Sequence, residues 1–116
     1  MFYQCYGLQS VNIPSSVKKI SDYAFYYCYS LPSIQIPSSV TSIGSSAFYN
    51  CYGLKIVDYG NDRTTVPPKP DGLSTNYSLR YIIVPDAVYD ATHVNSSWST
   101  WKDYLIKYSD YYSGEK

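Results

Sequence analysis

Three cysteines are the residues of this sequence whose type and spacing could do chemistry. Cys5, Cys28 and Cys51 recur at a constant interval in sequence number (28 − 5 = 23 and 51 − 28 = 23), and each follows a Phe and precedes a Leu at the same spacing. Thiolates in such a set could ligate zinc, pair as disulfides or act as nucleophiles. The sequence has no C-x2-C pair, however, and its one histidine, His93, lies outside the repeated segment. We therefore expect no metal site and no cysteine–histidine nucleophile.

A disulfide is the closer alternative for these cysteines. Stacked repeats bring equivalent strand positions to about 4.8 Å from each other, which is inside the Cα range that a disulfide tolerates. Equivalent side chains point in the same direction, however, and the number of cysteines is odd. We predict instead a ladder of reduced thiols that behave as small buried hydrophobic groups. All three thiols should then titrate without reductant.

The cysteines belong to a repeat that other residue types share. The recurring slots hold Phe2, Phe25 and Phe48; Leu8, Leu31 and Leu54; and Tyr6, Tyr29 and Tyr52. The segment IPSSV occurs at 13–17 and again at 36–40. A degenerate copy, LRYIIVP at 79–85, follows a connector at 58–72 that is rich in turn-forming Gly, Asn and Pro. Units of about 20–29 residues with spaced aliphatic residues are typical of leucine-rich solenoids.

Each unit predicts a short strand followed by a short helical turn. Leu8, Val11 and Ile13 point inward from the first strand, as the alternation of a strand requires. Ser21-Asp22 and Ser45-Ser46 are placed to cap the helical turns. A single unit cannot bury its apolar side alone, so the core forms by stacking. The predicted core consists of the inward slots Phe2, Cys5, Leu8, Val11, Ile13, Phe25, Cys28, Leu31, Ile34, Ile36, Phe48, Cys51 and Leu54.

The segment AFYYCYSLPSIQIPSSVTSIGSSAFYNCYGL at 24–54 resembles the BspA-like leucine-rich repeat, and the resemblance covers roughly residues 1–57. The segment YIIVPDAVYDATHVNSSWSTWKDYLIKYS at 81–109 is similar to the end of such proteins. This resemblance implies a secreted or surface-anchored bacterial protein, frequent in gut and oral commensals, with a role in adhesion. It implies no catalytic residue and no cofactor.

The fold we predict is a leucine-rich-repeat solenoid, an α/β-type superhelix of about four coils of about 23 residues. It has short parallel strands, 3-10 or short helical turns, and a helix that caps the C-terminal end. The solenoid spans 1–85, with coils that begin at residues 2, 25, 48 and, in degenerate form, about 71. The cap spans 86–109 and includes a helix at about 97–108, and 110–116 form a frayed tail. Apolar residues at helical spacing close the last coil, namely Trp98, Trp101, Leu105 and Tyr108.

Charge and hydropathy exclude several partners. Nine basic and nine acidic residues cancel, so no net field favours nucleic acid or an anionic membrane. No apolar run approaches the length of about 20 residues that a membrane span needs, and we expect no membrane insertion. The N-terminus shows no secretory signal, so a secreted or cell-surface location follows from the resemblance alone. Because the first coil is uncapped, we expect either self-association through its open strand edge or covering of this edge by residues that precede it in a longer parent protein.

Two surfaces are candidates for binding. Sixteen tyrosines indicate contact surfaces, because tyrosine combines apolar area with a hydrogen-bonding tip, or else reflect the residue usage of the source organism. One surface is a tyrosine ladder along the coils, made of Tyr6, Tyr29, Tyr52, Tyr26 and Tyr49. The other is an apolar patch at the C-terminal end of the sheet, made of Ile56, Tyr81 and Ile83. The alternatives are that the rings only pack on one another, and that the connector or the terminal helix covers the patch.

No constellation for catalysis occurs in the sequence. The carboxylates are scattered, and there is neither a G-x-S-x-G nucleophile motif nor a Gly-rich phosphate loop. We therefore expect no enzyme. The leading expectation is an extracellular module for protein–protein interaction and adhesion on a bacterial surface. The alternatives are a glycan-binding module that uses the tyrosine ladder, and a structural spacer that displays other domains.

Overall fold

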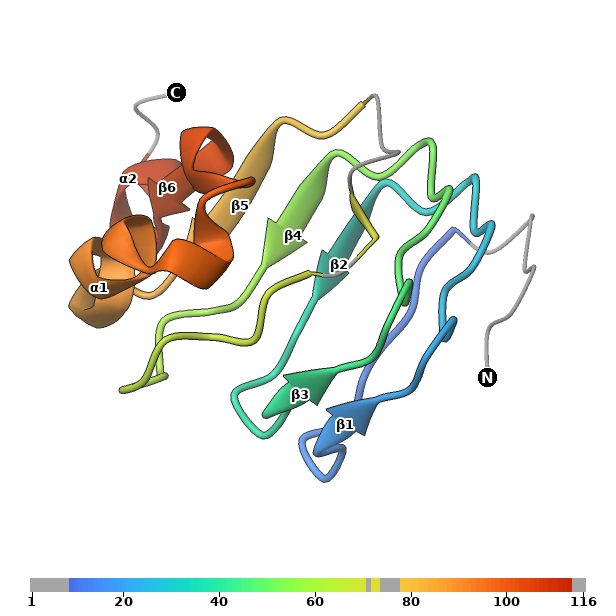
Figure 1. The fold of residues 1–116 in the computed structure, drawn as a ribbon, viewed down its shortest axis with the longest axis horizontal. Coiled ribbons are helices and arrows are strands. Elements are labelled where there is room, and N and C mark those ends of the chain that lie inside the picture. The colour runs from blue at the N-terminus through green and yellow to red at the C-terminus, as the bar shows by residue number, and fades with distance from the viewer. Residues whose placement is uncertain (1–8, 71, 74–77, 114–116) are drawn as a thin grey trace.

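The computed structural model describes residues 9–70, 72–73 and 78–113. The expectations for Phe2, Cys5, Tyr6 and Leu8 lie outside these residues. Successive repeats lie side by side, and two parallel sheets run along the stack (Figure 1). The larger sheet has the order β2-β4-β5-β6, and its strands are Ser33–Gln35 (β2), Ile56–Asp58 (β4), Tyr81–Val84 (β5) and Leu105–Lys107 (β6). The smaller sheet pairs Lys19–Ile20 (β1) with Ser42–Ile43 (β3).

The register of the larger sheet follows the repeat of the sequence. Ile34 pairs with Val57, Val57 with Ile82, and Ile82 with Leu105. These four residues form one inward row, and none of them is more than 9% exposed. The step from Ile82 to Leu105 again equals the interval between the cysteines (105 − 82 = 23). The sheet therefore continues into the segment where we expected only a cap.

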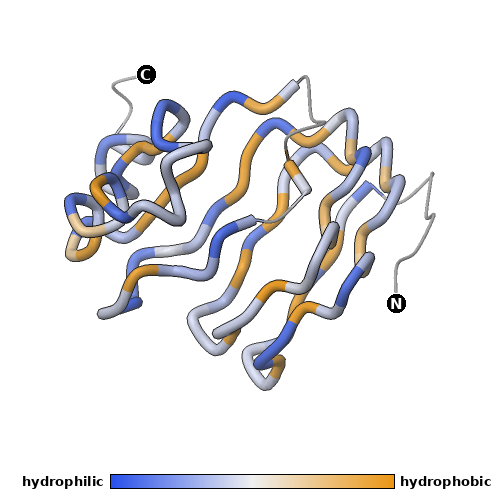
Figure 2. Tube along the Cα trace, viewed as in Figure 1, coloured by the Kyte–Doolittle hydropathy of each residue, from blue (hydrophilic) through white to orange (hydrophobic). Residues whose placement is uncertain are grey.

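Equivalent core residues stack on one another from coil to coil. The rings of Phe25 and Phe48 are parallel, with an interplanar angle of 1° and centroids 5.5 Å apart. Other inward slots are also buried, namely Cys28, Leu31, Ile34, Ile36, Cys51 and Leu54. Val11 and Ile13 are partly buried against this cluster. Hydrophobic positions recur at corresponding places in successive coils, as Figure 2 shows, so the core runs along the stack.

The third side of each described repeat consists of turns with hydrogen bonds between residues three apart, such as Cys28 N–H to the carbonyl of Phe25, where we expected 3-10 or short helical turns. Tyr23 and Ser46 have left-handed φ angles of 60° and 57°, at equivalent slots. A residue in this conformation interrupts a right-handed helix. The backbone N–H of Phe25 instead donates to the carbonyl of Ala47 in the next coil, at 2.8 Å.

The expected helix caps have a different role for the same reason. The Asp22 carboxylate does not cap a helix of its own coil. Its Oδ1 accepts a hydrogen bond from the N–H of Ser45 at 2.8 Å, across the coil boundary. Asp22 thus links neighbouring repeats, and this contact explains why the side chain is polar at that position.

The prediction of one helix at 97–108 is wrong. Helix α1 (Tyr89–Val94) follows a 3-10 turn at Asp86–Val88, and two further 3-10 turns, Ser96–Trp98 and Lys102–Tyr104, precede β6. Pairing with β5 gives the backbone N–H and C=O groups of β6 hydrogen-bond partners. At the end of an isolated helix, the corresponding groups would have no partners. Trp98 and Trp101 are nevertheless buried in the core, at 1% and 8% exposure.

The residues after β6 also differ from the expected frayed tail. A short helix, α2, spans Tyr108–Tyr112 and contacts both β6 and β5. Residues 114–116 lie outside the described part of the chain. Among the described residues, no helix has the length and apolar character of a membrane span.

Candidate functional site

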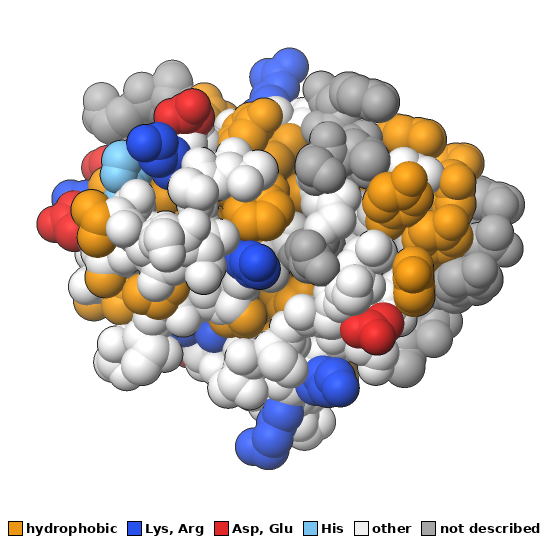
Figure 3. Space-filling view, viewed as in Figure 1, with side chains coloured by type: hydrophobic (Ala, Val, Ile, Leu, Met, Phe, Trp, Pro, Cys, Tyr) orange, Lys and Arg blue, Asp and Glu red, His pale blue; other side chains and the backbone are white. Residues whose placement is uncertain are grey.

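The tyrosine ladder is a stacked surface along the turns. Tyr29 and Tyr52 are stacked with centroids 5.1 Å apart, and Tyr26 and Tyr49 with centroids 5.6 Å apart. Tyr29 is 37% exposed and Tyr52 39%. Hydrophobic side chains gather on the right of Figure 3, on the side of the turns near 20–30 and 44–53. The rings therefore pack on each other and still present an exposed surface.

The apolar patch that we expected at the C-terminal end of the sheet is covered. Ile83 is completely buried, and Ile56 and Tyr81 are only partly exposed. The ring of Tyr111 in α2 lies edge-on to that of Tyr81, with centroids 5.6 Å apart. The patch is therefore an internal contact with the terminal helix, and Ile83 is not a surface residue.

Two carboxylates hold α2 in this position. Asp58 accepts a hydrogen bond from the hydroxyl of Tyr112. Asp86 accepts one from the backbone N–H of Ser109 at 3.0 Å. Hydrogen bonds from the backbone and side chain of Ser109 hold the pKa of Asp86 below its usual value.

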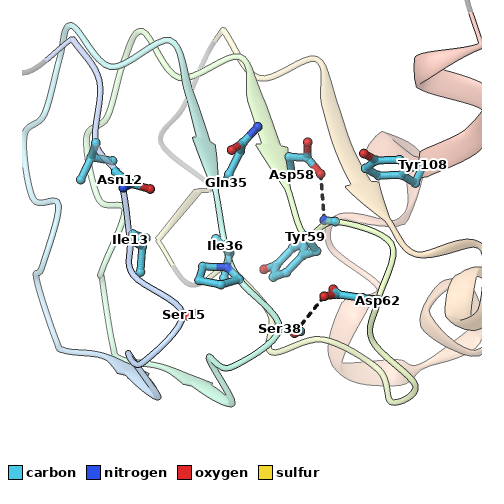
Figure 4. Close-up of a pocket in the computed structure, with 13 residues that line it drawn as sticks. Asn12, Ile13, Ser15, Gln35, Ile36, Ser38, Asp58, Tyr59, Asp62 and Tyr108 are labelled. Carbon is cyan, nitrogen blue, oxygen red and sulfur yellow. Dashed lines mark hydrogen bonds between the residues drawn. The ribbon is translucent and has the colours of Figure 1, made fainter.

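A pocket of about 320 Å³ opens on the face of the larger sheet, beside α2 (Figure 4). Two of its polar side chains, Gln35 and Asp58, lie directly opposite each other on β2 and β4. Asn12 occupies the same repeat slot one coil earlier (35 − 12 = 23). The other polar lining side chains are Ser15, Ser38, Asp62 and Tyr108. The described lining contains no Lys, Arg or His.

Asp58 is held in place in the lining of this pocket. Its side chain is 6% exposed, and its Oδ1 accepts a hydrogen bond from the N–H of Gly60 at 2.8 Å. Asp62 is exposed and accepts a 3.3 Å hydrogen bond from the hydroxyl of Ser38. Sequence reasoning did not identify this pocket. The signal was present in the outward slot that holds Asn12, Gln35 and Asp58, a column of polar residues on neighbouring coils.

The cysteines described by the structure are not placed for chemistry. Cys28 and Cys51 are completely buried and reduced. The Sγ–H of Cys51 donates to the carbonyl of Phe25 at 2.8 Å, and burial raises the pKa of this thiol to about 12. Such a thiol is not a nucleophile at neutral pH. No cluster of three or more potential metal ligands occurs in the described part of the chain.

The connector contains a buried arginine that sequence reasoning missed. Arg63 is 6% exposed and donates to the carbonyls of Val40 at 2.9 Å and Pro37 at 2.8 Å. It follows Val40 by one repeat (63 − 40 = 23), so it occupies an inward slot. The carbonyls of Pro67 and Pro68 accept hydrogen bonds from Trp98 Nε1 at 3.1 Å and from the Tyr59 hydroxyl at 2.6 Å. These contacts fasten the connector to the core.

Comparison with known proteins identifies relatives of this architecture. The sequence profile of the family described as "BspA type Leucine rich repeat region (6 copies)" matches residues 1–94. A solved structure of a leucine rich cell surface protein from Faecalibacterium prausnitzii is 33% identical, with a TM-score of 0.53. The match covers 67% of this chain and 20% of that protein, so the matched two thirds of this chain correspond to one fifth of that protein's length. None of the curated proteins compared with the chain matches it.

Proposed function

The chain belongs to the BspA-type leucine-rich repeat family, and on this basis we propose that it is a non-catalytic adhesion module, which binds proteins at a bacterial cell surface. The similarity to a leucine rich cell surface protein supports this location. In the described part of the chain, the thiols of Cys28 and Cys51 are completely buried, which fits a non-catalytic role.

The observation that carries the proposal is the exposure of stacked tyrosines. An isolated exposed ring needs no explanation, but Tyr23, Tyr29 and Tyr52 are 47%, 37% and 39% exposed on adjoining turns. Tyr23 also packs edge-on against Tyr26, with centroids 5.3 Å apart. Contacts between rings restrict their rotamers, so a partner would lose little conformational entropy on ordering them. Rigid aromatic rings with hydroxyl tips are characteristic of surfaces that bind proteins.

The test is binding of the purified chain to epithelial cells and to a panel of immobilised extracellular-matrix proteins. The double variant Tyr29→Ser/Tyr52→Ser removes the most exposed stacked pair of the ladder. We expect binding to fall by at least about tenfold, as for loss of aromatic residues central to an interface. The thermal midpoint should stay close to that of the parent chain.

The matched control is Val94→Ser, because Val94 is apolar and 79% exposed but belongs to α1, away from the ladder. This variant should bind as the parent does. If the double variant has a lower thermal midpoint but unchanged binding, the tyrosines of the ladder stabilise the fold and do not bind the partner. Binding to a glycan array that depends on Tyr29 and Tyr52 would favour the glycan-binding alternative. A chain that binds neither proteins nor glycans would favour a spacer that displays other domains.

A further inference from the structure

We propose that the pocket on the face of the larger sheet is a saccharide site, which takes a single neutral or amino sugar residue. This site is separate from the tyrosine ladder and uses different side chains, so it goes beyond the adhesion proposed above. Its walls come from residues 11–15 of the first coil, from β2 and the residues that follow it, from the end of β4, from the connector and from the start of α2 (Figure 4).

The repeat places the polar groups of the pocket in rows. Asn12, Gln35 and Asp58 share one outward slot on three neighbouring coils. Gln35 and Asp58 are paired in the parallel sheet, where neighbouring strands lie about 4.8 Å apart. Ser15 and Ser38 form a second row where the chain turns. Figure 4 shows both rows along the same opening. A ligand in this opening therefore meets hydrogen-bonding groups on two sides.

The chemistry of these groups matches a polyhydroxylated ring. Each sugar hydroxyl both donates and accepts a hydrogen bond. The amides of Asn12 and Gln35 also do both, whereas the carboxylates of Asp58 and Asp62 accept. The N–H of Gly60 fixes Asp58, which is 94% buried (100 − 6), so this acceptor is pre-oriented.

The pocket also offers apolar contacts for the carbon face of a sugar. Val11, Ile13 and Pro37 belong to its lining and are partly exposed, and the ring of Tyr108 stands at the α2 end (Figure 4). Tyr108 is held by the ring of Tyr112, with centroids 4.5 Å apart. The volume of about 320 Å³ lies at the lower end of the range for ligand pockets. This size suits one sugar residue at the end of a chain.

The charge of the pocket lining limits which sugars can bind. The described lining holds two carboxylates and no basic side chain, so an acidic sugar would bring a third negative charge without a partner. A neutral hexose brings none, and the ammonium of an amino sugar is attracted. A basic side chain of a protein fits less well, because its nitrogen atoms only donate hydrogen bonds, whereas the amides of Asn12 and Gln35 offer donors as well as acceptors.

The experiment is saturation-transfer-difference NMR with four probes at equal concentration. The probes are methyl β-D-glucopyranoside, D-glucosamine, N-acetylneuraminic acid and Nα-acetyl-lysine methylamide. We expect transfer to the first two, at the millimolar affinity usual for one sugar residue. We expect none to N-acetylneuraminic acid. Transfer to neither neutral nor amino sugar would overturn the proposal. Displacement of D-glucosamine by the lysine derivative, without transfer to the glucoside, would identify a site for basic side chains and also overturn it.

The variant Asn12→Ala/Gln35→Ala locates the binding. Both side chains are exposed, so the fold should be retained, and the affinity for the glucoside should fall at least about tenfold. Ser33→Ala is the matched control, since Ser33 lies on the same face of β2 but does not line the pocket. Equal affinity in both variants would contradict the assignment. Tyr29→Ser/Tyr52→Ser should bind the glucoside normally, so a failure of the saccharide site is distinguishable from a failure of the tyrosine ladder.

Discussion

The guanidinium carbon of Arg63 lies 5.3 Å from the centroid of the Tyr59 ring. Both residues occupy inward slots, because Tyr59 follows Ile36 and Arg63 follows Val40 by one repeat (59 − 36 = 23 and 63 − 40 = 23). A cation–π pair thus stands where the preceding coil has two aliphatic residues. The guanidinium also donates to carbonyls of that coil. The connector is therefore a modified repeat, joined to the solenoid by polar contacts inside the core.

Replacement of Arg63 by Ala should destabilise the protein strongly. The substitution leaves the carbonyls of Pro37 and Val40 without their donor and removes the contact with Tyr59. We expect the free energy of unfolding to fall by about 2–4 kcal/mol. Urea unfolding followed by tryptophan fluorescence measures it. Arg80→Ala, at an exposed position, should change it by less than about 0.5 kcal/mol. Similar losses in the two variants would show that the Arg63 contacts contribute little.

The fold could be predicted from the sequence wherever identical residues recur at the same slot. Equivalent side chains such as Phe25 and Phe48 must have equivalent surroundings in a stack, and their rings are indeed parallel. The prediction failed where the repeat is degenerate. Trp98, Trp101 and Leu105 have the spacing of a helix, but this spacing also fits two 3-10 turns followed by a strand. The position of Leu105, one repeat after its strand partner Ile82, was the signal that favours the strand.

The candidate surfaces could be predicted only in part. The tyrosine ladder follows from the repeat, because equal spacing places Tyr29 beside Tyr52. The covering of Ile56 and Tyr81 could not be derived, since it depends on where α2 folds after β6. The hydrogen bonds of Ser109 and Tyr112 to distant carboxylates determine that position, and no local pattern encodes such contacts.

Stability should fall at alkaline pH because of Cys51. Burial raises the pKa of its thiol from 9.0 to about 12 in the folded protein. Below pH 9 the thiol is protonated in both the folded and the unfolded protein, so the free energy of unfolding keeps the full contribution of the buried thiol. Between pH 9 and 12 the unfolded chain releases the proton and the folded protein retains it, so stability falls by up to about 1.4 kcal/mol per pH unit.

The measurement is the thermal midpoint as a function of pH, from pH 8 to 11, for the parent chain and Cys51→Ala. The variant should be less stable at pH 8, because it loses packing and the hydrogen bond to Phe25, but its midpoint should depend less steeply on pH. Rapid alkylation of Cys51 by iodoacetamide in the folded protein at pH 8 would contradict this account.

The hydrogen bond between Asp86 and Ser109 should control the docking of α2. The pKa of the Asp86 carboxyl is lower in the folded protein than its usual value of 3.8. The ionised carboxylate therefore contributes fully to stability above pH 3.8, and this contribution is lost as the pH falls through the lowered pKa of the folded protein. Asp86→Ala should release α2 at neutral pH. Hydrogen exchange of the Ser109 amide should then accelerate, while amides of β4 remain protected. Asp90→Ala, an exposed carboxylate in α1, is the control, and equal acceleration in it would assign the effect to surface charge.

Replacement of Gly53 by Ala should force neighbouring coils apart. A Cβ at this position would lie 2.3 Å from the carbonyl oxygen of Tyr29, which belongs to the backbone of the adjacent coil. The backbone must move to relieve this overlap, so we expect a loss of about 1–3 kcal/mol in the free energy of unfolding, measured with urea. Near-ultraviolet circular dichroism should also change, because Tyr29 and Tyr52 would separate.

Gly60→Asn is the contrasting control. Gly60 has a φ of +78°, but a Cβ there would meet only Asp62 Oδ1, at 3.6 Å. Asparagine tolerates left-handed angles, so this variant should lose less than about 1 kcal/mol. At Gly53 the lack of space determines the residue, whereas at Gly60 the backbone angle determines it. A Gly53→Ala variant as stable as the parent would mean that the coils can separate at this point, which is incompatible with rings stacked at 5.1 Å.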